Sequence, residues 1–576
     1  MRKGKEMVTK RNADLHSIQD VVCANTGMSV EELLNDQQSY PIDNLQSAAI
    51  ILRDAVRSGK TIYIMGDYDV DGICASSILF MGLNSVNANV VVKLPKRFSE
   101  GYGLKAEAVE ACEDGQVLIT VDNGIASIDA IKKAKEKGMT VIVTDHHLPI
   151  MDEKTNQPIL PEADVIIDPN AIPDSAAFNG YCGAGLAYRL CRFMLGTKHW
   201  LMPKLLSFAA IATVADSVPL IKDNRLLVKY GLQAMIDRRG NTKGLYALLC
   251  ELNLDKYITA ENIGFKLAPV LNAPGRLRDD GAMDAFHLLT FEGRYDDAKS
   301  MAQALMQDNQ TRRELSDTWT KKVIDSIEEN GMQDDYPLVA YEKEIPEGII
   351  GIVAGRVAEK FHAPCFLLGE SATTGIAKGS SRSDGVCNLK ALLDDHKDFL
   401  ISYGGHAPAA GLKLFTEHIA EFRSALLRDM HGKRPSSLVE KDEYDLKIST
   451  NDIESTMKEL QKFAPYGEGN PMPVFYLEDL TLVPVGTEYF KLISDGRGVK
   501  LLSPNVEAVK FDGGEEYVEL GKPRHVSLLG TLSVHHFMGK FKNQMEYFKI
   551  YPSKSTARTS PLARALANRA VGRYKN

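Results

Sequence analysis

The chain has 576 residues and a formal net charge of −8, and 44% of its residues are hydrophobic and 25% charged. These values are typical of a soluble globular protein of about three or four domains, and they exclude a globally basic nucleic-acid binder. The eight cysteines are scattered without a Cys-x-x-Cys pair. No apolar run approaches the ~18 residues of a membrane span, and the basic start lacks an apolar core. We therefore expect a cytoplasmic protein without a secretory signal, a membrane span or a structural zinc site.

The first 44 residues are predicted to be a helical extension. Ser29 followed by Glu32 is a capping-box pattern for a helix start, and Gln46 to Arg57 repeats apolar residues at helical spacing. From Thr61 to about Asp168, short β-branched apolar runs alternate with helical segments. This alternation predicts a doubly wound α/β domain.

Three of these apolar runs end in polar clusters. The clusters are Asp67-Tyr68-Asp69-Val70-Asp71-Gly72 after 61–65, Asp122-Asn123-Gly124 after 117–121, and Asp145-His146-His147 after 140–144. Because ligand sites of parallel sheets lie beyond the carboxyl ends of the strands, we expect the clusters to meet in one crevice. So much negative charge needs a counter-charge, for which a divalent metal is the natural candidate.

Each cluster also has an ordinary interpretation. Aspartates such as Asp69 and Asp71 are often only helix caps, and Asp122-Asn123-Gly124 is also a common turn sequence. Asp216, which ends the apolar run 205–215, is by itself better interpreted as an exposed acid at a helix end. The adjacent pair 146–147 is a stronger indication, since neutral imidazole is a common metal ligand, although a solvated loop pair is the alternative.

The combination of these residues favours a metal site. Carboxylates with imidazole and without thiolates suit Mn²⁺ or Mg²⁺, and the imidazole favours Mn²⁺. Two such ions ~3.5–4 Å apart can activate water and stabilise both oxygens of an in-line phosphoryl displacement.

The remainder of the chain divides into three further regions. Residues 180–237 are predicted to be mostly helical, and 298–314 contains no Gly or Pro, which predicts a long connecting helix. A second α/β unit is predicted over about 337–430. Over about 442–552, a helix at 452–463 precedes short strands with Gly and Pro turns, as in a small β-barrel. The stretch 553–576 has six Lys/Arg and no acid, which suits a phosphate-binding arm, a partner-binding helix or a solvated terminus.

The three clusters, in this order, resemble the DHH phosphoesterase superfamily. Further motifs between about Leu45 and Ile550 resemble its RecJ family of bacterial 5′→3′ single-strand-specific DNA exonucleases. Each motif is weak alone, but their ordered series is specific. They are Lys96-Arg97-Phe98-x-x-Gly101-Tyr102-Gly103-Leu104, Asn272-Ala273-Pro274-Gly275-Arg276, Gly348-x-x-Gly351-Ile352-Val353-Ala354-x-Arg356, Gly379-Ser380-Ser381-Arg382-Ser383, Gly404-Gly405-His406-x-x-Ala409-Ala410-Gly411 and Pro465-Tyr466-Gly467-x-Gly469-Asn470-Pro471.

The resemblance implies a two-metal site with Mn²⁺ or Mg²⁺. The implied ligands are Asp69, Asp71, Asp122, His146 and Asp216. Asp122 would bridge the ions, and His147 would support the site or contact the scissile phosphate, so that Asp122, His146 and His147 are the catalytic candidates. Many superfamily members carry a histidine four residues before the first ligating aspartate, where this chain has Met65. Either Asp67 substitutes as a ligand, or fewer protein ligands hold the first ion.

The later motifs imply contacts with nucleic acid. The second α/β unit resembles the DHH-associated domain, in which Gly404, Gly405 and His406 would approach a phosphate. Ser380 and Arg382, with Arg97 and Arg276 from the other lobe, resemble a pocket for the 5′-phosphate end, because a planar guanidinium can bind phosphate bidentately. Each arginine alone is better explained by a surface ion pair, and only the motif match favours the pocket. Tyr102, in the motif of Arg97, joins this nucleic-acid-binding set.

The β-rich region resembles an OB-fold, which binds single strands through a basic groove and stacking aromatics. Packing in the core would also explain most of its aromatic residues. The candidates for strand contact are Phe475, Tyr489, Phe490, Lys491, His536, Phe537, Lys540 and Phe541.

We therefore expect a multidomain α/β protein. Its predicted parts are a helical extension (1–44), a doubly wound DHH lobe (45–237), a helical region with the connecting helix (238–335), a DHH-associated α/β lobe (336–432), a β-barrel OB-fold (433–552) and a basic tail (553–576).

The implied function is metal-dependent 5′→3′ degradation of single-stranded DNA to 5′-mononucleotides, in DNA repair and recombination. We expect a monomer in the bacterial cytoplasm, of host or phage origin, with a single-strand binding protein or a helicase as partner candidates. One alternative is a DHH phosphodiesterase acting on oligoribonucleotides or cyclic dinucleotides, against which the third domain argues. The other is a non-catalytic Cdc45-like scaffold, a class that typically loses metal ligands which this chain has.

Overall fold

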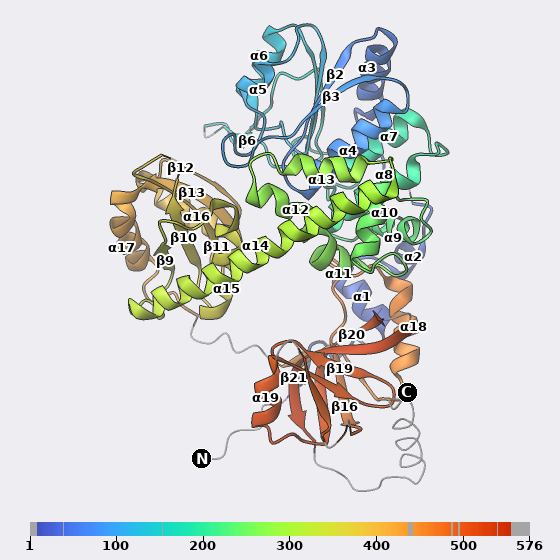
Figure 1. Cartoon of the computed structure of the whole chain (residues 1–576), viewed down its shortest axis with the longest axis vertical. Coiled ribbons are helices and arrows are strands. Elements are labelled where there is room, and N and C mark those ends of the chain that lie inside the picture. Colours follow the sequence, from blue (N-terminus) through green and yellow to red (C-terminus); the bar gives the residue numbers. More distant parts are fainter. Residues whose placement is uncertain are drawn as a thin grey trace.

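The computed structural model describes residues 8–553 except 39, 153, 372, 436–441, 485, 487, 494–495 and 538–539, and it leaves out the side chains of 535–537 and 540. Two α/β lobes are joined by one long helix, and a β-rich part lies below them (Figure 1). Apart from its first residue, the predicted basic tail lies outside the described residues. No helix among the described residues is both long and apolar enough to cross a membrane.

The first lobe is built on a five-stranded parallel sheet with strand order β3-β2-β4-β5-β8. Its strands are β2 (Thr61–Met65), β3 (Asn89–Lys93), β4 (Val117–Val121), β5 (Thr140–Thr144) and β8 (Val165–Ile167), with a separate hairpin of β6 (Ile150–Met151) and β7 (Pro158–Ile159). Its helices are α3 (Leu45–Arg57), α4 (Val70–Asn84), α5 (Ala106–Glu110), α6 (Ile128–Glu136), α7 (Gly183–Leu195), α8 (Met202–Ala215) and α9 (Lys222–Ile236). The prediction that β2, β4 and β5 are neighbouring buried strands is confirmed.

Alternate residues of these strands enter two cores, as expected for a parallel sheet covered on both faces. Ile62 and Ile64 pack in a core with α3, α4, α7 and α8. Tyr63 and Met65 pack in the opposite core with α5 and α6. Both faces are therefore covered, and the expected place for a ligand site is the carboxyl edge of the sheet.

A helical region connects the lobes. It consists of α10 (Lys243–Glu251), α11 (Ala260–Asn262), the π-helical turn η1 (Ile263–Leu267), α12 (Ala268–Leu277), α13 (Ala282–Thr290) and α14 (Tyr295–Glu329). The predicted connecting helix is α14, which has 35 residues. Ala302 and Leu305 belong to the core of the first lobe, and Val323 and Ile327 belong to the core of the second. One helix therefore contributes to both cores, so both lobes are packed on α14 (Figure 1).

The second lobe has a five-stranded mixed sheet with order β12-β13-β11-β10-β9. Its strands are β9 (Leu338–Tyr341), β10 (Cys365–Glu370), β11 (Ile376–Arg382), β12 (Ser402–Gly405) and β13 (Ala409–Phe415). Its helices are α15 (Ile350–Phe361), α16 (Leu389–Asp395) and α17 (Ile419–Asp429), with 3₁₀ turns η2 (Glu347–Ile349), η3 (Lys397–Phe399) and η4 (Thr416–His418). The predicted second α/β unit is confirmed.

The third part has a seven-stranded sheet with order β15-β16-β20-β21-β19-β18-β17. Its strands are β15 (Leu446–Ile448), β16 (Phe475–Thr481), β17 (Phe490–Ile493), β18 (Gly498–Leu502), β19 (Glu507–Lys510), β20 (His525–Phe537) and β21 (Lys540–Pro552). Helices α18 (Ile453–Phe463) and α19 (Gly514–Glu519) accompany it. In the described residues, no pairing between β15 and β17 closes the sheet, although its strand number and order fit an OB barrel.

The N-terminal extension packs on this third part. It contains β1 (Thr9–Lys10), α1 (Ile18–Thr26) and α2 (Val30–Leu34), and the capping box of Ser29 and Glu32 is present as predicted. Strand β1 pairs in parallel with β14 (Glu443–Tyr444), and Val22 and Leu33 lie in the core of the third part. The two ends of the described chain therefore stabilise one unit, which the sequence did not predict.

The candidates for strand contact in the third part differ in their exposure. Phe475 is fully buried in the core and is not available for stacking. Tyr489 and Phe490 are half-buried against the same core, whereas Phe541 is 60% exposed. Lys491 is exposed, and the side chains of His536, Phe537 and Lys540 lie outside the described residues.

Candidate metal centre and strand-end pocket

Asp69 and Asp71 lie where β2 passes into α4. Asp69 is the N-cap of α4, and its Oδ1 accepts the backbone N–H groups of Asp71 and Gly72 at 2.9 and 3.1 Å. Both oxygens of Asp71 accept backbone N–H groups at the start of α7, from Gly183 at 2.6 Å and Ala184 at 2.7 Å. The capping interpretation of Asp69 is therefore confirmed. It is compatible with a metal-ligand role, because these bonds use only Oδ1.

Asp122 and His146 form the centre of the site. Asp122 follows β4 with a φ of 62°, a left-handed conformation that is uncommon outside glycine. Its Oδ1 lies 3.0 Å from Nε2 of His146. The same Nε2 lies 3.7 Å from Oδ2 of Asp71 and 3.7 Å from Oδ2 of Asp216, the C-cap of α8. One imidazole nitrogen thus faces three carboxylates that come from three different segments.

Asp67 completes a second group of carboxylates. Oxygens of Asp67, Asp69 and Asp122 lie within 4.8 Å of one another. Asp67 is 2% exposed, and its Oδ1 has no hydrogen-bond partner in the described structure. A buried carboxylate oxygen without a partner is costly, and a bound cation would remove that cost. The donor set of carboxylates with one imidazole therefore fits Mn²⁺ or Mg²⁺.

The metal-capable groups share residues. Ligand atoms of Asp71, His146 and Asp216 also lie within 4.8 Å of one another, as do those of Asp122, His146 and His147. The structure thus brings together all six predicted metal residues. Met65 is buried in the core with α5 and α6, so its side chain offers no ligand to this cluster.

The pKa values of the clustered aspartates reflect the same crowding of negative charge. Burial and the charges of neighbouring carboxylates raise the pKa of Asp69, and they raise the pKa values of Asp67 and Asp122 well above the ordinary range. Burial and the charges of Asp71 and Asp69 raise the pKa of Asp216 to about 8. Without a cation the cluster therefore holds protons at neutral pH, and a divalent ion would displace them.

The pKa values of the two adjacent histidines shift in opposite directions, and Asp145 is the main cause of the rise at His147. Asp145 is buried, and its Oδ1 lies 2.7 Å from Nδ1 of His147. Burial alone would lower the pKa of His147, but the hydrogen bond and charge of Asp145 outweigh burial and raise that pKa to about 9. Burial lowers the pKa of His146. His146 is therefore the neutral imidazole that a metal ligand must be, and His147 is a cation.

Tyr102 lies beside His147 at the carboxyl edge of the first-lobe sheet. Its hydroxyl oxygen is 3.0 Å from Nδ1 and 3.2 Å from Nε2 of His147. Its ring is 44% exposed. This places a predicted nucleic-acid-binding residue in direct contact with a predicted catalytic residue.

Arginines from three parts of the chain gather between the lobes. Burial and the charges of Arg97, Arg312 and Arg382 lower the pKa of Arg276 to about 10. The guanidinium of Arg97 lies 4.0 Å from the ring centroid of Tyr68, and that of Arg382 donates to Oγ of Ser380 at 2.8 Å. In the described part of the chain, none of the four arginines forms an ion pair with a carboxylate. Unpaired cations at one place indicate an anion site.

The arginine group is built by a close approach of the lobes. Nη1 of Arg276 donates to the carbonyl oxygen of Gly348 at 3.1 Å. A Cβ on Gly348 would lie 1.9 Å from the carbonyl oxygen of Arg276, so only glycine fits there. Arg312, on α14, was not predicted, because a single arginine in a charged helical run carries no motif.

In the described residues, no hydrogen bond or ion pair joins the metal cluster to Gly404, Gly405 or His406. Gly404, Gly411 and Ser380 stand in one row across β12, β13 and β11. Gly404 and Gly411 border a groove of about 220 Å³, and His406 is exposed. The predicted phosphate contact of these three residues stays a prediction.

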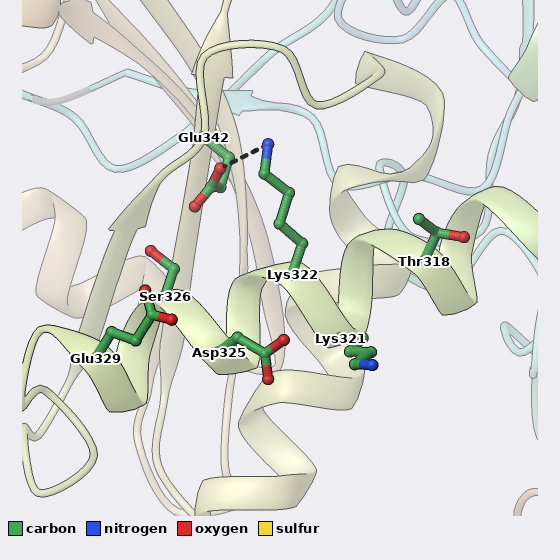
Figure 2. Close-up of a pocket in the computed structure, with 7 residues that line it drawn as sticks. All are labelled: Thr318, Lys321, Lys322, Asp325, Ser326, Glu329 and Glu342. Carbon is green, nitrogen blue, oxygen red and sulfur yellow. Dashed lines mark ion pairs between the residues drawn. The ribbon is translucent and has the colours of Figure 1, made fainter.

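A second groove, of about 430 Å³, runs along α14 (Figure 2). Lys322 spans toward β9 and pairs with Glu342 at 3.4 Å, and the other lining side chains include Lys321, Asp325 and Glu329. None of the residues that line this groove belongs to the metal cluster, so the two sites are distinct.

Three segments of the chain match known domain families. Residues 61–213 match the DHH family N-terminal domain, 334–431 the DHHA1 domain and 444–547 the RecJ OB domain. The first and second lobes and the third part thus each have a counterpart among known domains.

Relatives match across most of the chain. The single-stranded-DNA-specific exonuclease RecJ of Bacillus subtilis is 33% identical over 519 residues, which are 88% of this chain and 63% of that protein. The enzyme of the same name from Salmonella typhimurium is 31% identical over 552 residues, 91% of this chain and 92% of that one.

A solved structure has the same arrangement. RecJ of Thermus thermophilus in complex with Mn²⁺ has a TM-score of 0.74 and 28% identity, covering 93% of this chain and 76% of that one. The same protein in complex with Mg²⁺ has a TM-score of 0.68 and 26% identity, covering 93% and 75%. The fold match therefore includes both lobes and the third part.

Proposed function

This chain belongs to the RecJ family of single-stranded-DNA-specific exonucleases, and we propose that it degrades single-stranded DNA from the 5′ end to 5′-mononucleotides with two bound Mn²⁺ or Mg²⁺ ions. The observation that carries this proposal is the position of His146. Its Nε2 faces carboxylates of Asp71, Asp122 and Asp216, while Arg97 of the same lobe belongs to the arginine group at the second lobe. A metal centre and an anion site in one molecule suit an enzyme that holds a strand end and cuts beside it.

The residues divide naturally between two ions. Asp67, Asp69 and Asp122 would hold one, and Asp71, His146 and Asp216 the other, with Asp122 close to both. When bound, such ions lower the pKa of water and neutralise charge on the scissile phosphate. Asp145 keeps His147 protonated, so that its imidazolium can stabilise the negative charge that develops on the phosphate.

The arginine pocket explains the proposed polarity. Release of a 5′-mononucleotide breaks the bond between phosphorus and O3′, adds water oxygen to phosphorus and protonates O3′. The phosphate stays on the remaining strand as its new 5′ end. Arg97, Arg276 and Arg382 can then receive that phosphate, since a guanidinium binds phosphate bidentately, and the next cut repeats the first.

The third part supports DNA rather than a dinucleotide as substrate. Its match to the RecJ OB domain covers 444–547, and OB-folds bind single strands. A non-catalytic Cdc45-like scaffold is disfavoured by the intact cluster of Asp67, Asp69, Asp71, Asp122, His146 and Asp216. A role in DNA repair and recombination fits this activity. The monomeric state, the cytoplasmic location and the single-strand binding protein or helicase partners stay predictions.

Digestion of end-labelled strands tests the activity. With Mn²⁺, a 5′-labelled single strand should release labelled mononucleotide at once, whereas a 3′ label should stay in long products, and a duplex should resist. Asp122→Ala should abolish release, and Asp129→Ala, an exposed acid on α6, should not. Equal cleavage by the Asp122 variant would refute the metal assignment, and early release of the 3′ label would refute the polarity.

The end pocket has its own test. Arg382→Ala should weaken the use of 5′-phosphorylated strands more than it weakens overall strand affinity, because the guanidinium is proposed to contact the terminal phosphate. An equal effect on both quantities would refute the pocket.

A further inference from the structure

One carboxylate joins two segments that carry the arginines. Asp279 lies in the turn between α12 and α13, three residues after Arg276. Its Oδ1 accepts the backbone N–H groups of Phe98 at 2.8 Å and Ser99 at 3.2 Å. Its Oδ2 accepts the hydroxyl of Ser99 at 2.6 Å. Both oxygens are thus engaged with the residues that follow Arg97, some 180 positions away in the sequence.

The segment that carries Arg97 is a closed turn. The carbonyl oxygen of Lys96 accepts the N–H groups of Glu100 and Gly101 at 3.0 Å each, and the Glu100 carboxylate accepts the N–H of Lys96 at 3.0 Å. These bonds make 96–101 a compact unit. The bonds from Phe98 and Ser99 to Asp279 tie this unit to the end of α12, so Asp279 sets where the turn stands relative to α12.

The two arginines repel each other. Arg97 and Arg276 are close enough that the charge of Arg97 contributes to the lowered pKa of Arg276. In the described structure, no carboxylate pairs with either guanidinium. Besides the contact of the Arg97 guanidinium with the ring of Tyr68, the turn that carries Arg97 is held against this repulsion by three hydrogen bonds to the charged Asp279 carboxylate.

We infer that Asp279 is a positioning residue, which fixes the spacing of Arg97 and Arg276 and thereby sets the preference for a 5′-phosphorylated end. The inference rests on the end pocket of the proposed function. Within the described structure, the hydrogen bonds of the Asp279 carboxylate all go to the turn. Its removal should therefore act through Arg97 and should leave the metal centre unchanged.

The test compares two strands of one sequence that differ only in a 5′-phosphate or a 5′-hydroxyl. For the wild type, Asp279→Ala and Arg97→Ala, kcat and KM are measured on both strands with Mn²⁺. We expect Asp279→Ala to lower the ratio of the two kcat/KM values by roughly 10-fold, mainly through KM of the phosphorylated strand. The double variant should lower the ratio no further than Arg97→Ala alone, because both changes remove the same contact.

Graded variants separate positioning from general damage. Ser99→Ala removes only the bond to Oδ2, and Asp279→Asn keeps an acceptor for the two N–H groups, so both should give intermediate ratios. They also carry the test if Asp279→Ala does not fold. Asp280→Ala, the exposed neighbouring acid, should match the wild type.

The outcomes distinguish the two proposals. An unchanged ratio in Arg97→Ala overturns the end pocket and the positioning role together. A changed ratio in Arg97→Ala with an unchanged ratio in Asp279→Ala overturns only the positioning role. Equal loss on both strands, or additive effects in the double variant, also overturns it.

Discussion

The Nδ1 atom of His147 lies 2.7 Å from Oδ1 of the buried Asp145. The same carboxylate accepts the backbone N–H groups of His146 at 2.8 Å, His147 at 3.2 Å and Ile125 at 2.9 Å. Because Asp145 is saturated by these donors, it orients the turn rather than facing an ion. Asp145 is part of the Asp145-His146-His147 motif, but it is not one of the proposed metal ligands.

Asp145→Asn should remove the cationic character of His147. Loss of the negative charge should bring the pKa of His147 from about 9 down toward its ordinary value of 6.5, since the hydrogen bond and charge of Asp145 contribute most to raising it. At pH 7.5 kcat should fall by roughly 100-fold, the scale for losing one transition-state donor. Proton titration of His147 by NMR in metal-free protein and steady-state kinetics measure the two effects. Asp129→Asn is the control, and a His147 pKa that stays near 9 in Asp145→Asn would contradict the assignment.

The stability of the metal-free protein should fall as pH rises from 6 to 8. In the folded state, Asp216 has a pKa of about 8 against an ordinary 3.8, so the folded state binds more protons than the unfolded state between these values. Stability then declines with pH by up to about 1.4 kcal/mol per pH unit for each such proton. The raised pKa of His147 acts in the same direction, because its contribution is lost as pH rises toward about 9.

Thermal unfolding with EDTA and with Mn²⁺ at pH 6, 7 and 8 checks this dependence. The Tm with EDTA should decrease across the series, and the rise in Tm on adding Mn²⁺ should grow, because fewer protons must be displaced. Asp216→Asn should flatten the EDTA series. A Tm with EDTA that increases with pH would show that the carboxylates are not protonated in the folded state.

Asp67→Asn should remove one of two Mn²⁺ equivalents. The buried Oδ1 of Asp67 has no partner in the described structure, and Met65 is turned into the opposite core, so Asp67 is the candidate ligand for the position where the superfamily resemblance implies a histidine. Calorimetric titration should give two sites in the wild type and one in the variant, with kcat lowered by roughly 100-fold or more. Two undiminished sites in the variant would mean that Asp67 is not a ligand.

The clustering of the candidate metal residues could be predicted from the sequence because its signals are local. Each of β2, β4 and β5 is a β-branched run followed directly by polar residues, and parallel strands of such composition must align their carboxyl ends. Asp216 ends an apolar helical run, and α8 does end there. The uninterrupted helical run likewise predicted α14.

Contacts between distant segments were not predictable in the same way. Arg11 donates to the buried Asp445 at 3.0 Å across 434 positions, and nothing in either local sequence indicates this pair. Phe475 and Phe541 have the same side chain, yet one is in the core and the other is 60% exposed. Whether such a residue is buried depends on which elements pack together in the fold, and the periodicity of the sequence does not show that packing.

The geometry of the centre also depends on a residue with no side chain. A Cβ on Gly183 would lie 2.5 Å from Cβ of Asp122, and the N–H of Gly183 donates to Asp71. Gly183→Ala should therefore push the start of α7 away from the sheet, displacing two carboxylates while every ligand remains in the sequence. A displacement of 1 Å can cost roughly 100-fold in rate, and overpacking costs about 1–3 kcal/mol in stability.

Gly185→Ala, slightly further along α7, is the matched control, because its new Cβ would meet its nearest atom, in the ring of Tyr181, at an ordinary 3.4 Å. Rates of strand digestion, Mn²⁺ affinity and Tm are measured for both variants. Gly183→Ala should lose most activity and some Mn²⁺ affinity, and Gly185→Ala should stay within about twofold of the wild type. Wild-type activity in Gly183→Ala would show that the approach of α7 to Asp122 does not position the ligands. Equal losses in both variants would instead trace the effect to helix α7 as a whole.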